Sequence, residues 1–351
     1  MAANADESQI YPLYDTTFSL HRVSPLHTGL DDPLDDAILR DQARRFRDIL
    51  TGEVLRGVRV GTDNEDSTLA HMGALQTVTW TQLPFEENWN GQTGQVVGDE
   101  DTTVILSESR GLLLRIAYEK MEYTAILLRD IKPGDWDETN VGENSDVDGF
   151  EHFPLLLLKM PVSLRDAFTD FLATTFDARI SALQFPSSYV TTAFEQYLAY
   201  VCVDEEGEQL DALESTRATK NVMGAVEVFI GFNLPGGSSA LKTMDIKLSR
   251  DDLPRIIARG KVAGNGQEDT PLWNALTAYV NAHLALDLKH ERVKVIRIAC
   301  DAFVLGAEGK VKFLYPGADE DVHSAQRRAT RRLVNGLIEA ARGGSLANMR
   351  P

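Results

Sequence analysis

The sequence predicts an α+β fold built from mixed, mostly antiparallel sheets with flanking helices. Short segments in which apolar and polar residues alternate occur in both halves of the chain, as in half-buried strands. Segments with apolar residues three and four positions apart, typical of amphipathic helices, separate several of them. Hydrophobic residues make up 43% and charged residues 25% of the 351 residues, as in globular proteins.

The length predicts one large domain or two lobes, and the distribution of elements favours two lobes. Residues 11–160 are expected to form a sheet-rich N-terminal lobe. Residues 161–342 are expected to form a lobe of helices and sheet that carries a partner interface. The polar segments 1–10 and 343–351 are expected to be disordered tails.

The first lobe begins with an alternating strand, Thr17–Val23, which Pro25 ends. Leu34–Leu50 carries an apolar stripe that predicts an amphipathic helix, with Gly52 as its C-cap. Further strands are expected at Val54–Val60, Leu75–Leu83 and Phe153–Met160.

The clearest feature of this lobe is a β-hairpin. Apolar, alternating strands at Leu112–Tyr118 and Tyr123–Leu128 flank the polar turn Glu119–Glu122. Two segments rich in Gly, Asn and acidic residues, 86–101 and 132–151, are expected to be surface loops, because they hold too few apolar residues to bury.

The second lobe mixes helices with two strand pairs. Helices are expected from Ser163, from Ser187 or Ser188 to Val201, from Ser249 to Gly260, from Pro271 to about Leu286, and from Val322 to Ala341. Strand pairs are expected at Val222–Leu234 with Leu241–Leu248 and at Val293–Leu305 with Lys310–Tyr315.

Composition narrows the class of protein. No apolar run approaches the roughly 20 residues that span a bilayer, and the polar, acidic N-terminus resembles no signal or transit peptide. Cys202 and Cys300 lie in apolar surroundings, so buried reduced thiols are expected, as in the cytosol or nucleus. The net charge of −18 repels phosphate, so the chain is not expected to bind nucleic acid unaided.

Sequence motifs for cofactors and catalysis are absent. Gly264–Asp269 begins like a dinucleotide loop but lacks the third glycine and stands between two helices. The acidic segment fails as a calcium loop, since Leu155 stands where a bidentate Glu is required. The seven histidines show no metal-ligand spacing. The sequence therefore predicts no cofactor, no metal and no catalytic site.

The alternating stretch Val222–Phe232 has two interpretations. It is either a central strand or a sheet edge that pairs with another chain by strand addition, and Val293–Leu305 is a second candidate for such pairing. The candidate partner-strand residues are Val226, Val228, Ile230, Phe232, Val295 and Arg297.

A basic C-terminal helix contrasts with the acidic rest of the chain. From His323 to the end, six arginines accompany a single acid, Glu339. The four-residue spacing of several of them predicts a double ridge, which is either a solvated face or a docking surface for acidic protein or phosphate. The candidate basic surface comprises Arg327, Arg328, Arg331 and Arg332, with Arg44, Arg45 and Arg47 on the first helix as the next group.

The opening segment Tyr11–Leu26 resembles the start of fungal members of the centromere protein L (CENP-L) family, subunits of the Sim4 complex. The resemblance continues through Gln42–Leu50, Asp48–Gly61, Gly73–Trp80 and the hairpin Leu112–Leu128. It covers the chain well to about residue 160 and carries no catalytic residue.

The resemblance implies an RdgC-like fold in a non-enzymatic inner-kinetochore scaffold, located in the nucleus at the centromere. It implies pairing with a centromere protein N (CENP-N) homologue and contact with other inner-kinetochore subunits. We expect contact with centromeric DNA only within that complex, possible homodimers of the isolated chain, and no membrane association. The alternative is an RdgC-like homodimer that encircles DNA by itself, and an enzyme is the third possibility.

Overall fold

The computed structural model describes residues 10–29, 34–55, 72–89, 109–130, 149–204, 206–233, 242–263, 270–317 and 320–343. Apart from residues 10 and 343, the expected tails 1–10 and 343–351 lie outside these residues, as do most of the two expected loops and the dinucleotide-like segment 264–269.

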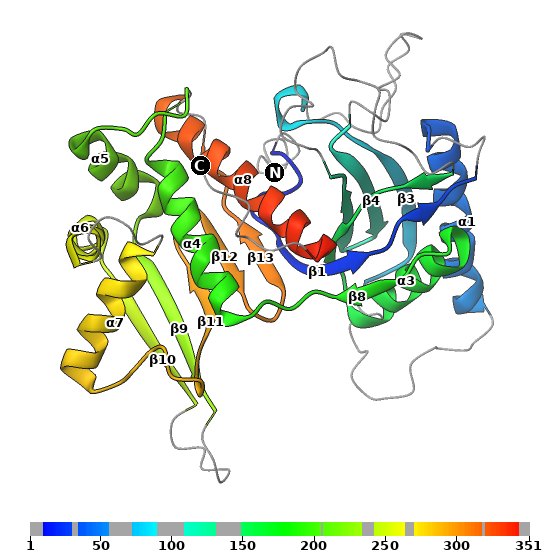
Figure 1. Ribbon diagram of the computed structural model, residues 1–351. Coiled ribbons are helices and arrows are strands. Elements are labelled where there is room, and N and C mark those ends of the chain that lie inside the picture. The colour runs from blue at the N-terminus through cyan, green and yellow to red at the C-terminus, as the bar shows by residue number, and fades with distance from the viewer. Residues whose placement is uncertain are drawn as a thin grey trace. The chain divides into compact units, whose positions relative to one another are not determined.

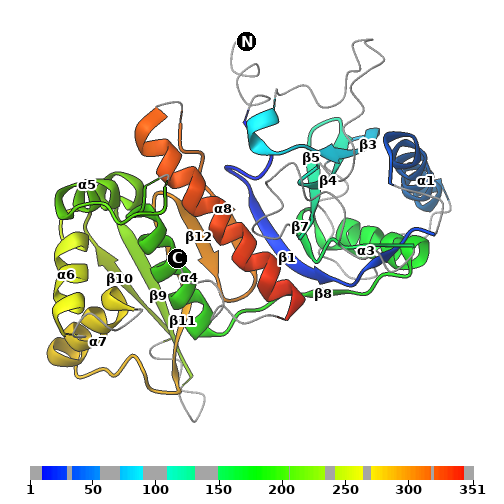
Figure 2. The ribbon, with the colours of Figure 1, turned by 45° about the horizontal axis from the view of Figure 1, so that its top comes forward.

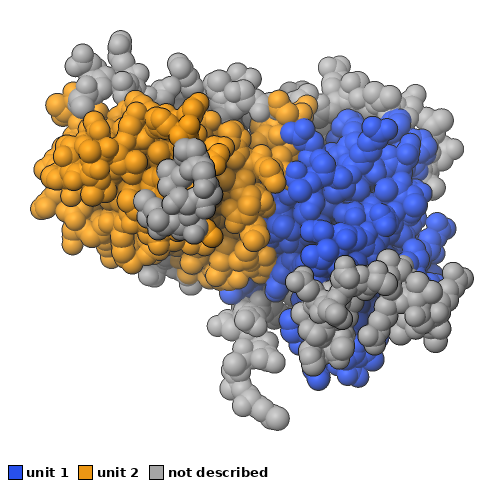
Figure 3. Space-filling view, turned by 90° about the horizontal axis from the view of Figure 1, so that it is seen from below, with its two compact units in different colours: residues 1–12, 18–182 blue, residues 13–17, 183–351 orange. Residues whose placement is uncertain are grey.

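The chain forms two compact units, coloured in Figure 3. The first unit comprises Met1–Pro12 and Phe18–Ala182, and the second comprises Leu13–Thr17 and Leu183–Pro351. The division lies after Ala182, beyond the predicted position near residue 160. The mixed α+β fold with mostly antiparallel pairing, predicted from the sequence, is confirmed. The RdgC-like character and the assignment of roles to two lobes stay predictions.

The first unit is built on an antiparallel sheet (Figure 1). In pairing order its strands are β1 (Thr17–Val23), β7 (Leu155–Lys159), β5 (Glu122–Leu128), β4 (Gly111–Tyr118) and β3 (Leu75–Leu83), and β8 (Ile180–Ala182) also pairs with β1. A small ladder joins β2 (Leu26–His27) to β6 (Phe150–Glu151). The predicted hairpin is confirmed as β4 and β5.

Among the described residues of the first unit, α1 (Asp36–Leu55) and α3 (Val162–Phe176) pack on the sheet, and a 3-10 turn, η2, covers Glu86–Asn88. Aromatic rings fill the core between helices and sheet. The ring of Phe46 lies 5.4 Å from Phe168 and 5.0 Å from Phe171, and Trp80 packs against both. Because such rings bury large apolar areas, this cluster is a main source of the unit's stability.

The predicted end of α1 was wrong. The helix begins after Asp35, whose carboxylate accepts the N–H groups of Ala37 and Ile38 at 2.9 and 2.8 Å. It continues through Gly52 to Leu55, so the strand expected at Val54–Val60 starts inside a helix, and residues 56–60 of that prediction lie outside the described ranges. A glycine inside a helix costs only about 1 kcal/mol, which neighbouring helical residues offset.

The second unit also has an antiparallel sheet. Its strands, in pairing order, are β10 (Thr243–Leu248), β9 (Val226–Phe232), β11 (Val293–Ala299), β12 (Phe303–Gly306) and β13 (Lys310–Phe313). The stretch expected as one strand from Val293 to Leu305 therefore contains two, β11 and β12.

In the described part of the second unit, the helices that form one contiguous layer are α4 (Ser187–Val201), α5 (Ala212–Met223), α6 (Leu253–Ala263), α7 (Pro271–Leu284) and α8 (Glu320–Arg342). α4 packs against α8, α5, α7 and β11, and α6 packs against α5 and α7. α4 and α8 lie side by side in both ribbon views (Figure 1, Figure 2).

The helix α5 was not predicted. Asp211 caps it by accepting the N–H groups of Leu213 and Glu214, both at 2.8 Å. Gly224, with φ of +56°, ends it before β9 begins. The strand expected from Val222 therefore starts four residues later, because its first residues complete a helical turn.

Candidate partner-binding surface

The side chains of β9 divide between two faces of the second unit's sheet. Val226, Val228 and Ile230 are at most 1% exposed and lie under the helical layer. Glu227, Phe229 and Gly231 alternate with them and are only partly buried. Since successive side chains of a strand point to opposite faces, the second set lies on the face opposite the helices.

The register extends this second face across all five strands. Residues directly opposite each other in a ladder share a face. The resulting open sheet face comprises Glu227, Phe229 and Gly231 on β9, Thr243, Asp245 and Lys247 on β10, Lys294, Arg297 and Ala299 on β11, Val304 and Gly306 on β12, and Lys310 and Lys312 on β13. Lys294, Arg297 and Lys310 are exposed.

Four of the predicted interface residues were wrong. Val226, Val228, Ile230 and Val295 face the helices and are at most 3% exposed, so none is available to a partner in the folded unit. Phe232 is half-buried on the helical side. Arg297 is exposed and belongs to the open sheet face. The alternation identified the strand, and its apolar phase is the one that faces the core.

Strand addition at β9 or β11 was also a wrong expectation. β9 is paired on both sides, by β10 and β11, and β11 is paired by β9 and β12. Neither strand has a free row of backbone groups. The central-strand interpretation of Val222–Phe232 is the one that the structure supports.

The outer edge of β10 is the end of the second unit's sheet among the described strands. The N–H of Phe232 bonds to the carbonyl of Lys242 at 3.0 Å, so Lys242 directs its backbone groups toward β9. Alternate residues direct theirs to the same side. Met244, Ile246 and Leu248 therefore bond inward, and the backbone groups of Thr243, Asp245 and Lys247 point outward from the edge.

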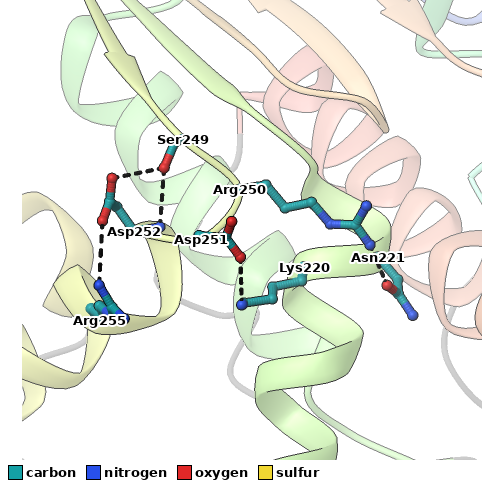
Figure 4. Close-up of polar contacts among 7 residues, drawn as sticks. All are labelled: Lys220, Asn221, Ser249, Arg250, Asp251, Asp252 and Arg255. Atoms are coloured by element: carbon teal, nitrogen blue, oxygen red, sulfur yellow. Dashed lines mark hydrogen bonds and ion pairs between the residues drawn. The ribbon is translucent and has the colours of Figure 1, made fainter.

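A polar cluster fixes the turn that follows β10 (Figure 4). The Nζ of Lys220 on α5 lies 2.7 Å from a carboxylate oxygen of Asp251, and Arg250 donates to the side chain of Asn221. The hydroxyl of Ser249 bonds to the carboxylate of Asp252 at 2.7 Å. These contacts tie the end of β10 to α5 and so hold the edge strand in place.

Two contacts order the open sheet face. The guanidinium carbon of Arg297 lies 3.7 Å from the centroid of the Phe229 ring, which is a close cation–π contact. The Nζ of Lys247 lies 2.6 Å from the carboxylate of Glu227, and this hydrogen bond raises the pKa of the lysine. Phe229, Lys294 and Lys310 were missed from the sequence; the polar phase of the same alternating strands was the available signal.

The predicted double ridge of α8 is partly covered by its own unit, and of its four arginines Arg332 is exposed. Arg328 donates to the carbonyl of Val203 at 3.1 Å, and Arg327 donates to the carbonyl of Gly317 at 3.5 Å. The guanidinium of Arg332 lies 5.4 Å from the ring centroid of Tyr200. Arg327, Arg328 and Arg331 are partly buried, so their side chains help to hold α8 within the second unit.

The arginines of α1 are more accessible. Arg44 and Arg45 have side chains 77% and 63% exposed, and both approach the carboxylate of Asp41, at 3.9 and 3.0 Å. Arg47 is also exposed. Exposed pairs of this kind contribute little stability, so these arginines remain available to a partner.

The second unit buries several titratable side chains, among them the thiol of Cys300. Burial raises the pKa of the Cys300 thiol to about 12, which keeps it protonated and unreactive. Both cysteines are free, and Cys300 is buried as expected, whereas Cys202 is only partly buried. Among the described residues, no group of three or more His, Cys, Asp or Glu side chains is placed to hold a metal ion.

None of the helices that the structure describes is long and apolar enough to cross a membrane.

The family model described as "CENP-L: Centromere protein L" matches residues 12–342, nearly the whole chain. No curated protein matches the sequence. The match confirms the family recognised from the opening segment and the hairpin, and it extends over the second unit. That family consists of structural kinetochore subunits of the constitutive centromere-associated network and is not known as an enzyme family. The chain therefore belongs to the centromere protein L (CENP-L) family, whose members are centromere and kinetochore proteins of the nucleus.

Proposed function

We propose that this chain is a non-enzymatic scaffold subunit that pairs with a CENP-N homologue and, in that complex, helps to attach the kinetochore to centromeric chromatin. The observation that carries the proposal is the outer edge of β10 in a chain of the CENP-L family. An unpaired strand edge is a row of backbone donors and acceptors that a strand from another chain completes.

The edge suits strand addition in several respects. β10 is six residues long and contains no proline, and its end is fixed by the ion pair of Lys220 with Asp251. Its outward residues, Thr243 and Asp245, are exposed. A strand from a second copy of the chain can use the same edge, which is the basis for expecting homodimers when the partner is absent.

The charge of the chain supports DNA contact only within a complex. At −18, the chain repels phosphate on average, and three of the four α8 arginines are partly buried in their own unit. The predicted basic residues that are exposed, Arg44, Arg45 and Arg47 on α1 and Arg332 on α8, are the candidates for a shared DNA surface. A basic partner would have to supply most of the attraction.

Co-expression of the full chain with the CENP-N homologue tests the proposal. We expect a stable complex in size-exclusion chromatography with light scattering, and DNA affinity at physiological salt that appears in the complex and not in the isolated chain. Tight DNA binding by the isolated chain as a homodimer would support the RdgC-like alternative. Failure to form a complex would contradict the proposal.

A further inference from the structure

The open sheet face is locally basic in a strongly acidic chain. Among the described residues, its register places five cations, Lys247, Lys294, Arg297, Lys310 and Lys312, on the same face as two carboxylates, Glu227 and Asp245, and the carboxylate of a third acid, Glu308, lies over Gly306. Lys247 and Glu227 neutralise each other. The remaining cations lie across β11 and β13.

Apolar side chains form the floor between these cations. Phe229, Ile296 and Val304 are half-buried on this face, and Gly231 and Gly306 add no side chains to it. A Cβ at Gly231 would contact Ile296 at 3.0 Å, which places the Ile296 side chain on the open side of the sheet. The surface is therefore both basic and apolar.

One of these cations, Arg297, packs against an aromatic ring. The guanidinium carbon of Arg297 lies 3.7 Å from the centroid of the Phe229 ring, and a guanidinium stacked on a ring can still donate through the N–H groups at its edge. A carboxylate accepts from such a fork with two parallel hydrogen bonds. Lys294 on β11 lies opposite Gly231 on β9. Because glycine has no side chain, the opposite residue of β9 does not cover Lys294.

We infer that the open sheet face binds an acidic polypeptide segment that also carries apolar side chains. A nucleic-acid backbone fits less well, because it offers nothing to the apolar floor and because Asp245 and Glu308 stand at the two sides of the Arg297 row. The face continues into the outer edge of β10, since Asp245 has its side chain on the former and its backbone groups on the latter. The inference concerns different atoms from the strand pairing proposed above and does not depend on it.

The probe is a fluorescein-labelled peptide of four Glu-Leu repeats flanked by Gly-Ser, measured by anisotropy with the full chain at low salt. Peptides of four Lys-Leu and four Glu-Ser repeats and a 20-base-pair DNA duplex serve as comparisons. We expect the Glu-Leu peptide to bind at least tenfold more tightly than any of the three, and its affinity to fall with added salt.

Two triple variants with equal net charge separate the site from a general charge effect. The first variant is expected to weaken peptide binding at least tenfold, and it combines Lys294→Glu, Arg297→Glu and Lys310→Glu. The second variant is expected to change peptide affinity less than twofold, and it combines Arg217→Glu, Arg255→Glu and Arg259→Glu at exposed positions on the helical side. Both are checked for folding by thermal melting.

Phe229→Ala is expected to weaken binding severalfold while leaving the charges in place. Equal losses in the two triple variants, or duplex DNA binding as tightly as the Glu-Leu peptide, would overturn the inference. Pairing with the CENP-N homologue is measured on the same triple variants. If the Lys294, Arg297 and Lys310 variant still pairs with the homologue but no longer binds the peptide, the peptide site is separate from the β10 edge. If the unaltered chain binds the peptide but does not pair with the homologue, only the proposed function is rejected.

Discussion

An oxygen of the Glu195 carboxylate, on α4, lies 2.7 Å from the backbone nitrogen of Trp273 in the first turn of α7. Pro271 at the start of α7 has no N–H, and the side chain of Thr270 makes no capping hydrogen bond. A carboxylate from another helix therefore satisfies the free donors at this helix N-terminus. Glu195 is only 5% exposed, and burial raises its pKa to about 7.

The raised pKa of Glu195 predicts a fall in stability as the pH rises. Between about pH 4.5 and 7 the unfolded chain releases this proton while the folded chain keeps it, so ionisation costs the folded state more. From pH 5 to pH 8 the free energy of unfolding of the unaltered chain should fall by about 2–3 kcal/mol more than that of Glu195→Gln. Urea unfolding at both pH values measures the difference.

The matched control for Glu195 is Glu214→Gln, which alters an exposed glutamate in the first turn of α5. Its pH dependence should follow that of the unaltered chain. An equal fall for the unaltered chain and Glu195→Gln would show that Glu195 does not titrate in this range.

A buried hydroxyl pair should contribute measurably to the packing of α4 against α8. The Tyr197 hydroxyl lies 3.1 Å from the Thr330 hydroxyl, and Tyr197 is 1% exposed. Tyr197→Phe should lower the free energy of unfolding by about 1 kcal/mol. A double-mutant cycle with Thr330→Val should give a coupling of about 0.5–1.5 kcal/mol, and a coupling near zero would contradict the contact.

The arginines of α8 and α1 should respond differently to removal. Arg328→Ala should lower the free energy of unfolding by about 1–3 kcal/mol, because the carbonyl of Val203 loses a charged donor. Arg44→Ala should change it by less than about 0.5 kcal/mol, since that side chain is 77% exposed. Equal losses would contradict the structural role of Arg328.

Salt dependence of DNA binding distinguishes the same two groups within the complex. Replacing Arg44, Arg45 and Arg47 by Ala should lower the slope of log affinity against log salt by about 0.9 for each phosphate that is no longer neutralised. Replacing Arg327, Arg328 and Arg331 by Ala should leave the slope unchanged, provided that the variant folds. An unchanged slope for the α1 variant would show that α1 touches no phosphate.

Local periodicity predicted most of the strands. It also predicted those helix ends that are marked by strong capping or periodicity signals in the sequence. The hairpin of β4 and β5 was predicted to within a residue, and α8 was expected from Val322 to Ala341, close to its observed span of Glu320–Arg342. Where signals conflicted, the prediction failed. Gly52 is a good C-cap, but α1 continues through it, because a single glycine costs too little to end a helix that packs on β3.

The candidate surfaces depended on contacts distant in sequence and were predicted poorly. The apolar phase of β9, with Val226 and Val228, is the one that meets the helices, but which strands flank β9 is decided by pairing between segments distant in sequence. The sequence did not identify β10 as the edge strand, because β9 also pairs with β11, which lies about sixty residues further along the chain. The contacts of the α8 ridge could not be predicted from the sequence either, because the carbonyls that Arg327 and Arg328 bind are supplied by Gly317 and, far away in sequence, Val203.

Pairing through the outer edge of β10 is tested most directly by Asp245→Pro in co-expression with the CENP-N homologue. Proline removes the outward N–H of residue 245 but leaves the bonds from Met244 and Ile246 to β9, and Asp245→Ala, which keeps the N–H, is the matched control. We predict that Asp245→Pro folds but lowers affinity for the partner at least tenfold in isothermal titration calorimetry, while Asp245→Ala changes it less than threefold. Unaltered affinity for a folded Asp245→Pro variant would contradict strand addition at β10.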